Sequence, residues 1–323
     1  MKKDYIKLEN ITFGYKKSPV IENFNLEIEE GSFTTLLGSS GCGKTTLLRL
    51  LAGFLEPTGG KIFINDELQN GILPDKRKIG MVFQNYALFP HMTVEQNLLY
   101  GLKIKKSTKE EKARFNEIVN NTAQVLGIKE LLYRFPHELS GGQQQRVALG
   151  RSLVLEPKVL LMDEPLSSLD ANLRAMVREE LKEIQKKLGI TTIYVTHDQE
   201  EAFYLSDKIA VIKDGKVLQY GTGRQLYFEP ADKFVAEFVG RANFVTEDSC
   251  EYVVRPEWVE LSLNDGDFSG KVLSADFLGD VTRFKVEIAD LSQSIYVDKK
   301  TLECENINSG DLVKIRFLRK WHQ

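Results

Sequence analysis

The segment from Gly38 to Thr45 constrains this chain more than any other, because it reads Gly-Ser-Ser-Gly-Cys-Gly-Lys-Thr and fits the phosphate-binding pattern G-x-x-x-x-G-K-[ST]. A β-rich run, Ser32–Leu37, precedes it, and a helix-like run, Thr45–Ala52, follows and stops at a glycine. Strand, glycine loop and helix is the order that such a loop requires, since backbone N–H groups at a helix N-terminus then surround a phosphate. The segment predicts a nucleoside triphosphate site in which Lys44 contacts the β- and γ-phosphates and Thr45 ligates Mg²⁺.

Length and composition restrict the class of protein. At 323 residues the chain is long enough for two domains, and its formal charge of −3 lacks the basic excess of a nucleic-acid-binding protein. The apolar runs fall short of the roughly 20 residues of a membrane span, and Met1–Tyr5 does not begin a signal peptide. Three widely spaced cysteines predict neither a disulfide framework nor a metal site, and Cys42 is interpreted as a small residue that fits its loop. We therefore expect a cytosolic protein.

The first part of the chain alternates between strand and helix patterns. Phe24, Leu26 and Ile28 alternate with polar residues, as in a half-buried strand. From about Thr93, where Gln96 completes a capping-box pattern, the character becomes helical. A charged stretch from about Ser107 to Leu126 is typical of a solvated helix face. Further strands are expected at Lys61–Asp66, Ile79–Phe83, Val159–Met162 and Thr191–Thr196. Strands that alternate with helices predict a parallel α/β sheet, which binds mononucleotides at the carboxyl ends of its strands.

From about Arg241 the chain is rich in short strands again. Turns separate the candidates, which suggests one small closed or sandwiched β domain. The candidate strands are Tyr252–Arg255, Val259–Leu263, Lys271–Phe277, Arg283–Ile288, Ile295–Val297 and Val313–Phe317.

Two further segments carry chemistry. Asp163 and Glu164 end the apolar strand Val159–Met162, where an aspartate can hold Mg²⁺ in its shell and the next carboxylate can reach a water beyond the γ-phosphate. Leu139–Gln143 places a serine and two glycines before a helical run, Gln144–Leu155, and so forms a second phosphate-friendly helix start. From these residues alone two interpretations stay open: a glycine-rich N-cap, or an anion site that completes the nucleotide site of a second copy.

Taken together, the motifs resemble the ATP-binding-cassette ATPases, specifically the subunits of bacterial solute importers. The resemblance is close over residues 4–240 and looser beyond. It rests on an ordered set of motifs: Tyr15, Gly38–Thr46, Gln84, Leu139–Gln143, Val159–Glu164, Ser168–Asp170 and His197.

The resemblance implies a role for each matching position. Tyr15 would stack on adenine, and the other ATP-binding residues would be Ser39, Ser40, Gly41, Cys42, Gly43, Lys44, Thr45, Thr46 and Gln84. Thr45, Gln84 and Asp163 would surround Mg²⁺. Glu164 would act as general base and His197 would contact the γ-phosphate, with Lys44 as the third catalytic residue. Ser140, Gly141, Gly142 and Gln143 would close on the ATP of a second copy in a head-to-tail homodimer. Asp170 would act across that dimer interface, unless it simply caps its helix.

The resemblance also implies partners and a location. Gln84–Pro90 resembles the loop that transmits subunit motion to an integral membrane permease, for which its exposed aromatic residues would be suited. An extracytoplasmic solute-binding protein would act indirectly, and the chain would lie on the cytoplasmic face of the membrane. The resemblance implies no nucleic-acid partner.

The C-terminal segment gives weaker indications. Val254–Val259, with its Arg-Pro-Glu, and Asp276–Asp280 resemble landmarks of the OB-like accessory domains of such importers. Regulatory ligand sensing, dimer bracing and a purely structural role stay open, and we favour bracing. The stretch from Tyr220–Thr222 through Phe238–Phe244 most resembles the ferric-iron and phosphonate branches of these importers. The resemblance therefore implies ferric iron as the imported solute, followed by phosphonate or polyamine.

The sequence therefore predicts an α/β P-loop NTPase core of the RecA-like kind, with an antiparallel β subdomain and a helical subdomain, followed by a small all-β OB-like domain. The nucleotide-binding domain is expected at 1–240, with its helical subdomain at about 90–158, and the accessory domain at 241–323. The competing class is a non-transport cassette ATPase that acts on ribosomes or nucleic acid. Its relatives usually carry two cassettes or long heptads, whereas this chain has one of each motif.

Overall fold

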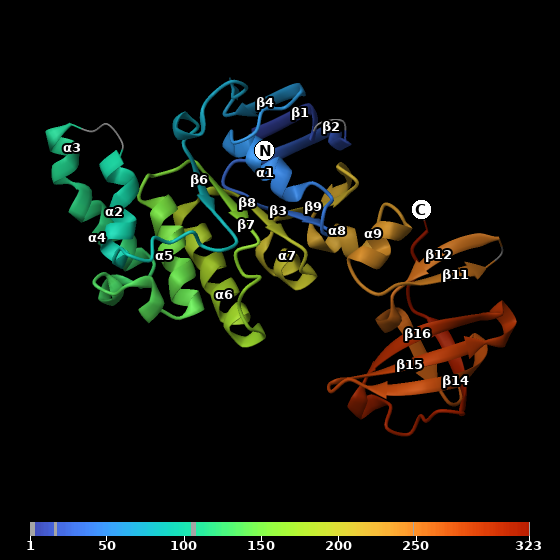
Figure 1. The fold of residues 1–323 in the computed structure, drawn as a ribbon. Helices are drawn as coiled ribbons and strands as arrows, with labels where there is room; N and C mark the ends of the chain where they lie inside the picture. The colour runs from blue at the N-terminus through green and yellow to red at the C-terminus, as the bar shows by residue number, and fades with distance from the viewer. Residues whose placement is uncertain (1–3, 16–17, 105–107, 248, 323) are drawn as a thin grey trace. The chain divides into compact units, whose positions relative to one another are not determined.

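The computed structural model describes residues 4–15, 18–104, 108–247 and 249–322, and it divides the chain into two compact units. Unit 1 is Met1–Gly223 and unit 2 is Arg224–Gln323. Unit 1 combines sheets with helices, whereas unit 2 is mostly strands (Figure 1). Among the described residues, no helix is both long and apolar enough to cross a membrane.

An antiparallel sheet forms the first layer of unit 1, with the strand order β2-β1-β4-β5. Its strands are β1 (Asp4–Tyr15), β2 (Ser18–Glu29), β4 (Gly59–Ile64) and β5 (Glu67–Leu68). Phe24, Leu26 and Ile28 are buried while Asn25 and Glu27 are exposed, so the predicted alternation is confirmed. This sheet is the antiparallel β subdomain that the sequence predicts.

The central layer of unit 1 is a six-stranded sheet with the order β10-β9-β3-β8-β7-β6. Its strands are β3 (Phe33–Gly38), β6 (Ile79–Val82), β7 (Val159–Asp163), β8 (Thr191–Thr196), β9 (Lys208–Lys213) and β10 (Lys216–Gly221). All neighbours from β9 to β6 pair in parallel, and only the edge strand β10 is antiparallel. The predicted parallel α/β sheet is therefore confirmed. Its parallel strands present their carboxyl ends at one edge, where β3, β7 and β8 end at Gly38, Asp163 and Thr196.

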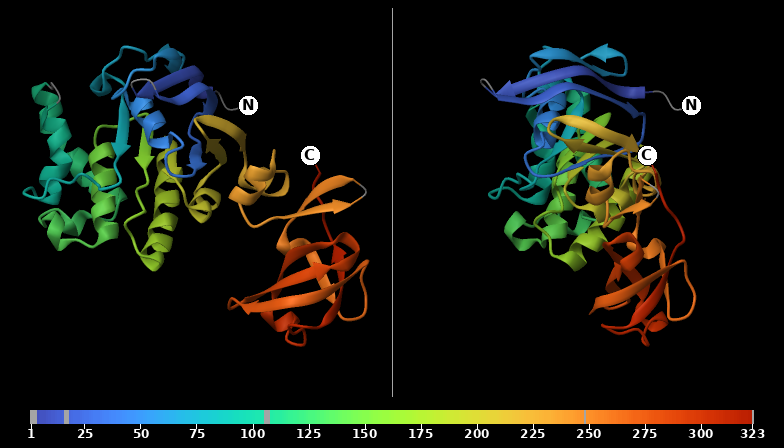
Figure 2. Two further views of the ribbon diagram at one scale, coloured as in Figure 1. Left: turned by 45° about the vertical axis from the view of Figure 1, so that its right-hand side comes forward. Right: turned by 90° about the vertical axis from the view of Figure 1, so that its right-hand side faces the viewer.

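The alternation of side chains along β7 explains why this sheet is covered on both faces. Val159 and Leu161 join one buried cluster, which contains the antiparallel sheet and α1 (Lys44–Ala52). Leu160 and Met162 point to the opposite face and join a second cluster. The helix α1 is thereby packed between the two sheets, and its N-terminus is fixed against the end of β3. Figure 2 shows the blue strands β1 and β2 in a layer apart from the green helices.

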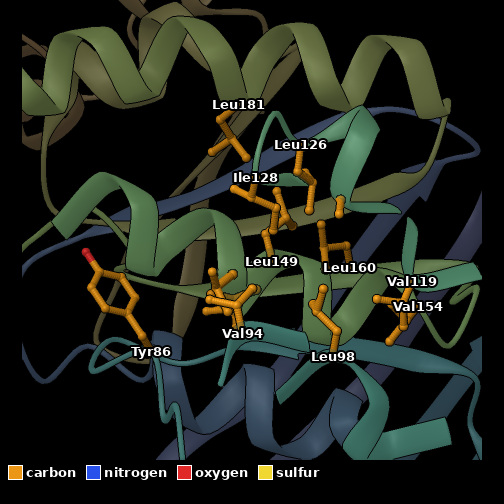
Figure 3. Packing of buried hydrophobic residues seen from close by; sticks show 14 of the residues in the cluster. Tyr86, Val94, Leu98, Val119, Leu126, Ile128, Leu149, Val154, Leu160 and Leu181 are labelled. Atoms are coloured by element: carbon orange, nitrogen blue, oxygen red, sulfur yellow. The ribbon is translucent and has the colours of Figure 1, made fainter. Parts of the chain in front are cut away.

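Helices cover the second face of the central sheet. Leu98 of α2, Leu149 of α5 and Leu181 of α6 pack together with Leu160 of β7 (Figure 3). The helices of this unit are α2 (Val94–Ile104), α3 (Lys109–Ala113), α4 (Phe115–Val125), α5 (Gly141–Leu153), α6 (Ala171–Leu188) and α7 (Gln199–Leu205). The capping box predicted before α2 is present, since Thr93 Oγ1 accepts from the N–H of Gln96 at 3.3 Å and Thr93 N–H donates to Gln96 Oε1 at 3.0 Å.

The charged stretch from Ser107 to Leu126 has the predicted solvated face. Ser107 lies outside the described residues, and the rest forms two helices, α3 and α4, that meet at Arg114. Their charged residues are exposed. The helix α4 also has a buried face, because Phe115, Val119 and Ala123 recur at helical spacing and are buried.

Unit 2 contains a curved antiparallel sheet, a half-barrel of order β13-β17-β14-β15-β16, and a separate hairpin, β11-β12. Its elements are α8 (Gly223–Phe228), α9 (Lys233–Phe238), β11 (Asn243–Glu247), β12 (Cys250–Val254), β13 (Val259–Ser262), β14 (Phe268–Phe277), β15 (Val281–Ile288), β16 (Gln293–Lys300) and β17 (Leu312–Phe317). The prediction of an OB-like β domain is confirmed. The helices α8 and α9 belong mostly to this compact unit, while the domain division at residue 240 stays a prediction.

A single buried guanidinium, that of Arg255, connects the helices of unit 2 to its strands. The side chain is completely buried. Its Nη1 donates to the carbonyl oxygens of Ala236 at 2.6 Å and Gly240 at 2.9 Å, and its Nη2 donates to that of Tyr227 at 3.0 Å. The Arg-Pro-Glu segment is therefore more than a turn, because its arginine satisfies carbonyl groups at the ends of α8 and α9.

We expect Arg255→Ala to destabilise unit 2 by about 3 kcal/mol, because it leaves several buried carbonyl groups without a donor. Both tryptophans of the chain, Trp258 and Trp321, lie in this unit. Their fluorescence during urea unfolding therefore reports unit 2 by itself. The matched control is Arg316→Ala, whose exposed ion pairs should contribute little. Equal midpoints for the two variants would contradict the assignment.

Candidate functional site

The glycine loop between β3 and α1 adopts a backbone that other residues disfavour. Gly41 has φ +84° and Gly43 has φ +104°, both in the left-handed region. Gly43 is the N-cap of α1, so the loop turns directly into the helix. The predicted order of strand, loop and helix is confirmed. The free N–H groups at the start of α1 form an electropositive site for an anion.

Lys44 is buried within this loop. Its ammonium group donates to the carbonyl oxygens of Gly38 at 2.7 Å and Ser39 at 2.9 Å. The sulfur of Cys42 lies 3.8 Å from the same nitrogen, and burial raises the pKa of that thiol. Cys42 thus packs as a small buried residue, and the loop holds the Lys44 charge beside the start of α1.

A pocket of about 220 Å³ opens at this helix start. Its lining comes from the loop, the first turn of α1, one residue of β2 and the end of β7. The lining residues are Val20, Ser40, Gly41, Gly43, Lys44, Thr45, Thr46 and Glu164. The pocket therefore combines backbone N–H groups, an ammonium group and a carboxylate, as hydrolysis of a bound phosphate requires.

Thr45 and Asp163 meet beside this pocket. Thr45 Oγ1 donates to Asp163 Oδ1 at 2.9 Å. Burial raises the pKa of Asp163, although the hydrogen bond from Thr45 and the charge of Lys44 oppose that shift. A half-buried carboxylate beside a hydroxyl is a hard oxygen donor set, and a divalent cation would offset the cost of desolvation. The residues present therefore fit Mg²⁺.

Glu164 and His197 form a second contact at the same sheet edge. His197 Nδ1 and Glu164 Oε2 are 3.1 Å apart. Glu164 has φ +45°, which is unfavourable for a residue with a side chain, and its N–H donates to Val195 O at 3.0 Å. Two donors from Ser167, the hydroxyl at 2.9 Å and the N–H at 3.2 Å, hold the Glu164 carbonyl oxygen. The strained backbone is thus fixed by hydrogen bonds that sequence reasoning missed.

The segment Gln84–Pro90 is only partly exposed. Gln84 Nε2 donates to Ser167 Oγ at 3.3 Å, which links it to the loop after Glu164. The expectation of exposed aromatic residues is wrong for Tyr86, which is 8% exposed and has its hydroxyl 3.1 Å from Ser168 Oγ. Tyr86 packs in the helical core (Figure 3), because its backbone turns through φ +58° and directs the ring inward.

Tyr15 lies at the end of β1 with 46% of its surface exposed. Its ring meets Phe13 edge-on at a centroid distance of 5.1 Å. The aromatic ring therefore has exposed surface on which a planar base can stack, and its role toward adenine stays a prediction.

Ser140 and Gln143 form a capping box at the start of α5. Ser140 Oγ accepts from Gln143 N–H at 3.4 Å, and Ser140 N–H donates to Gln143 Oε1 at 3.0 Å. A Cβ on Gly141 would lie 2.7 Å from Leu169, and one on Gly142 would lie 2.9 Å from Val177. The glycines thus permit close packing against α6 and the loop before it. Among the described residues, those that line the pocket beside Lys44 do not include Ser140–Gln143.

Asp170 caps α6, as the sequence predicts. Its Oδ1 accepts from the N–H of Leu173 at 3.0 Å, and Gly189 ends the helix with φ +60°. The capping function is therefore present in the single chain, whether or not Asp170 also acts at an interface.

Comparisons with known proteins agree with this arrangement. A family model described as ABC transporter matches residues 21–167, and a model described as TOBE domain matches residues 252–321. An Fe(3+) ions import ATP-binding protein from Fusobacterium nucleatum subsp. nucleatum is 45% identical over 319 residues, which covers 96% of this chain and 85% of that protein. A spermidine/putrescine import ATP-binding protein from Borreliella afzelii is 43% identical over 302 residues, covering 85% of this chain and 86% of that protein.

Solved structures agree as well. The structure of cbiO1 from Clostridium perfringens, part of the ABC transporter complex cbiONQ, is 33% identical and superposes with a TM-score of 0.64 over 71% of this chain and 93% of that one. An ATP-binding cassette of an ABC transporter in its ADP conformation is 24% identical with a TM-score of 0.65, over 73% of this chain and 98% of that one. The second likeness concerns the fold alone.

We expect Asp163→Asn to raise the melting temperature of the nucleotide-free chain and to reduce the stabilisation given by ATP with Mg²⁺. Burial raises the pKa of Asp163 in the folded chain. The ionised carboxylate therefore lowers the free energy of unfolding, by nothing at a pH below the ordinary aspartate pKa and by its full amount at a pH above the raised pKa of the folded chain. The gain in melting temperature over the parent chain should therefore be larger at pH 7 than at pH 4. Asp75→Asn, at an exposed position, is the control. A gain that is equal at both pH values would argue against a desolvated carboxylate.

Proposed function

The chain belongs to the ABC transporter family of ATP-hydrolysing import subunits, and we propose that two copies of it drive ferric iron uptake through separate membrane permease subunits. The observation that carries the choice of solute is the match to an Fe(3+) ions import ATP-binding protein at 45% identity over 319 residues. Polyamine is the second candidate, because a spermidine/putrescine import ATP-binding protein matches at 43% identity over 319 residues. Phosphonate ranks with polyamine on the sequence alone.

The proposed hydrolysis uses residues at the edge of the central sheet. Glu164 accepts a proton from a water, whose oxygen attacks the γ-phosphorus while the bond from that phosphorus to the β–γ bridging oxygen breaks. The products are ADP and inorganic phosphate. His197, 3.1 Å from Glu164, orients the carboxylate and contacts the γ-phosphate. Lys44 and the N–H groups of the glycine loop stabilise the charge on the phosphates.

Mg²⁺ fits the oxygen atoms of Thr45 and Asp163, and we assign Gln84 as the third residue near it. The cation supplies charge neutralisation for the phosphate oxygens when bound. Thr45 and Asp163 are already in contact at 2.9 Å, so their side chains are preorganised for this task. Gln84 is held through Ser167.

A second copy would complete the site. Ser140 and Gln143 lie at a helix start whose exposed serine accepts a hydrogen bond from Gln143 and has its hydroxyl proton to donate to a phosphate. In a head-to-tail dimer each such start would close on the nucleotide held by the glycine loop of the other copy. ATP would then stabilise the closed pair and hydrolysis would release it, because the ligand contacts differ between the two states.

The proposal also includes a location and indirect partners. The chain would lie on the cytoplasmic face of the membrane, bound to its permease through the region of Gln84–Pro90. A solute-binding protein outside the membrane would deliver the iron. Residues 1–240 would form the nucleotide-binding domain, and 241–323 an accessory domain that braces the dimer.

We expect Glu164→Gln to lower ATP turnover by about a hundred- to ten-thousand-fold, since it removes the proposed general base. The same variant should form an ATP-dependent dimer, because the amide keeps the size of the side chain. Turnover is measured by phosphate release and association by light scattering. Glu179→Gln, on the exposed side of α6, is the control. Near-normal turnover in Glu164→Gln would refute the role of Glu164.

The choice of solute is tested with the complete transporter. The chain is co-purified with its permease in lipid nanodiscs, and ATP turnover is measured with the solute-binding protein loaded with Fe³⁺, spermidine or a phosphonate. We expect stimulation by the Fe³⁺-loaded protein. Stimulation by spermidine alone would transfer the assignment to polyamines. Co-purification with ribosomes instead of a permease would favour the non-transport class.

A further inference from the structure

A buried carboxyl group, that of Glu201, holds the strand that leads to His197. Glu201 lies in α7 and is 3% exposed. Its Oε2 accepts hydrogen bonds from the hydroxyl groups of Tyr194 and Thr196, each at 2.7 Å. Both donors belong to β8, which ends one residue before His197. Burial of a carboxyl group is unfavourable without such partners, so this cluster fixes the end of β8 against α7.

Arg174 of α6 connects this cluster to a second loop. Its Nη2 donates to the carbonyl oxygen of Leu169 at 2.9 Å, and its Nη1 lies 3.4 Å from Asp198 Oδ2. Its Nε lies 3.9 Å from Glu201 Oε1. Leu169 follows Glu164 on the loop after β7, and Asp198 directly follows His197. One guanidinium group therefore contacts both loops that leave the proposed catalytic residues.

The shape of the guanidinium group suits this task. Two of its nitrogens donate to oxygens on two different loops, and its Nε lies at ion-pair distance from Glu201, an arrangement that a planar fork of fixed donors suits. A lysine ammonium group is a point donor and cannot keep the same three separations. The arrangement is thus specific for arginine.

The two proposed catalytic residues depend on their loops for position. The His197 side chain is 57% exposed, so little packing holds it. Glu164 has a left-handed backbone that its surroundings must maintain. Their side chains nevertheless meet at 3.1 Å. Loop geometry therefore sets this distance.

We propose that Arg174 is a positioning residue, which sets the contact between His197 and Glu164 by fastening their two loops together, with Glu201 as its buried support. The inference rests on the proposed roles of Glu164 and His197. Arg174 itself contacts neither side chain in this arrangement, so it acts on turnover through them.

The test compares Arg174→Lys with Arg178→Lys in the full chain. Arg178 lies one turn further along α6 and pairs with Glu200 of α7 at 3.4 Å, so it shares the helices and the type of contact but touches neither loop. We expect Arg174→Lys to lower kcat by about tenfold to a hundredfold at similar KM for ATP, because a small displacement of reacting groups costs that much. Arg178→Lys should keep kcat within about twofold of the parent chain.

A spectroscopic measurement accompanies the kinetics. The imidazole signal of His197, assigned by its loss in His197→Asn, should shift in Arg174→Lys and stay in place in Arg178→Lys. Asp198→Asn serves as a second variant, because asparagine keeps the N-cap of α7 while the charge that faces Arg174 is lost. It should change kcat and the His197 signal in the same direction as Arg174→Lys.

An unchanged kcat in both Arg174→Lys and Asp198→Asn overturns the proposal, whether or not the His197 signal moves. A lower kcat with an unmoved His197 signal also overturns it, because the effect would then be merely structural. These failures are distinguishable from failure of the proposed function. If only the positioning role is wrong, the parent chain still hydrolyses ATP and Glu164→Gln still lowers turnover as expected above.

Discussion

The parallel pairing of β3, β8 and β7 is the constraint on which the site depends. Thr35 of β3 lies opposite Tyr194 of β8, and Asp163 of β7 lies opposite Val195, so the three strands end at one edge. Parallel strands have aligned carboxyl ends, and the residues that follow them must meet there. The glycine loop, Glu164 and His197 are those residues.

One strained backbone position, Glu164, lies at the same edge. Glu164 has φ +45°, and the glycine loop has two positions in the left-handed region. Such conformations persist only where the surroundings maintain them. Here the maintenance comes from short hydrogen bonds: Ser167 to the Glu164 carbonyl, and Glu164 N–H to Val195. These hydrogen bonds hold charged groups in place at the sheet edge, and such preorganisation lowers the reorganisation needed for phosphoryl transfer.

Much of this architecture follows from local sequence signals. The glycine loop, the strand-end acids and the caps by Asp170 and Ser140 were predictable, because each depends on residues a few positions apart. The burial of Tyr86 and the contacts of Arg174 were not, because they depend on partners from distant segments: Ser168 for Tyr86, and Asp198 and Glu201 for Arg174. Likewise, the burial of Val119 was not predicted, although Phe115, Val119 and Ala123 recur at helical spacing. The sequence signals for the Arg174 contacts were an arginine four residues after the cap Asp170 and an aspartate directly after His197.

The central claim is that the glycine loop of one copy and the Ser140 helix start of another share one nucleotide. It is tested most directly by mixing two variants, Lys44→Ala and Ser140→Arg, each with Glu164→Gln to stop hydrolysis. In a mixed dimer with shared sites, one site carries both lesions and the other carries none. The account predicts one ATP enclosed between the copies of each mixed dimer and none enclosed in either variant alone, although the intact glycine loop of Ser140→Arg still binds exchangeable ATP. If the two elements of the same chain formed each site, every site would carry one lesion, and absence of enclosed ATP from the mixed dimer would contradict the account.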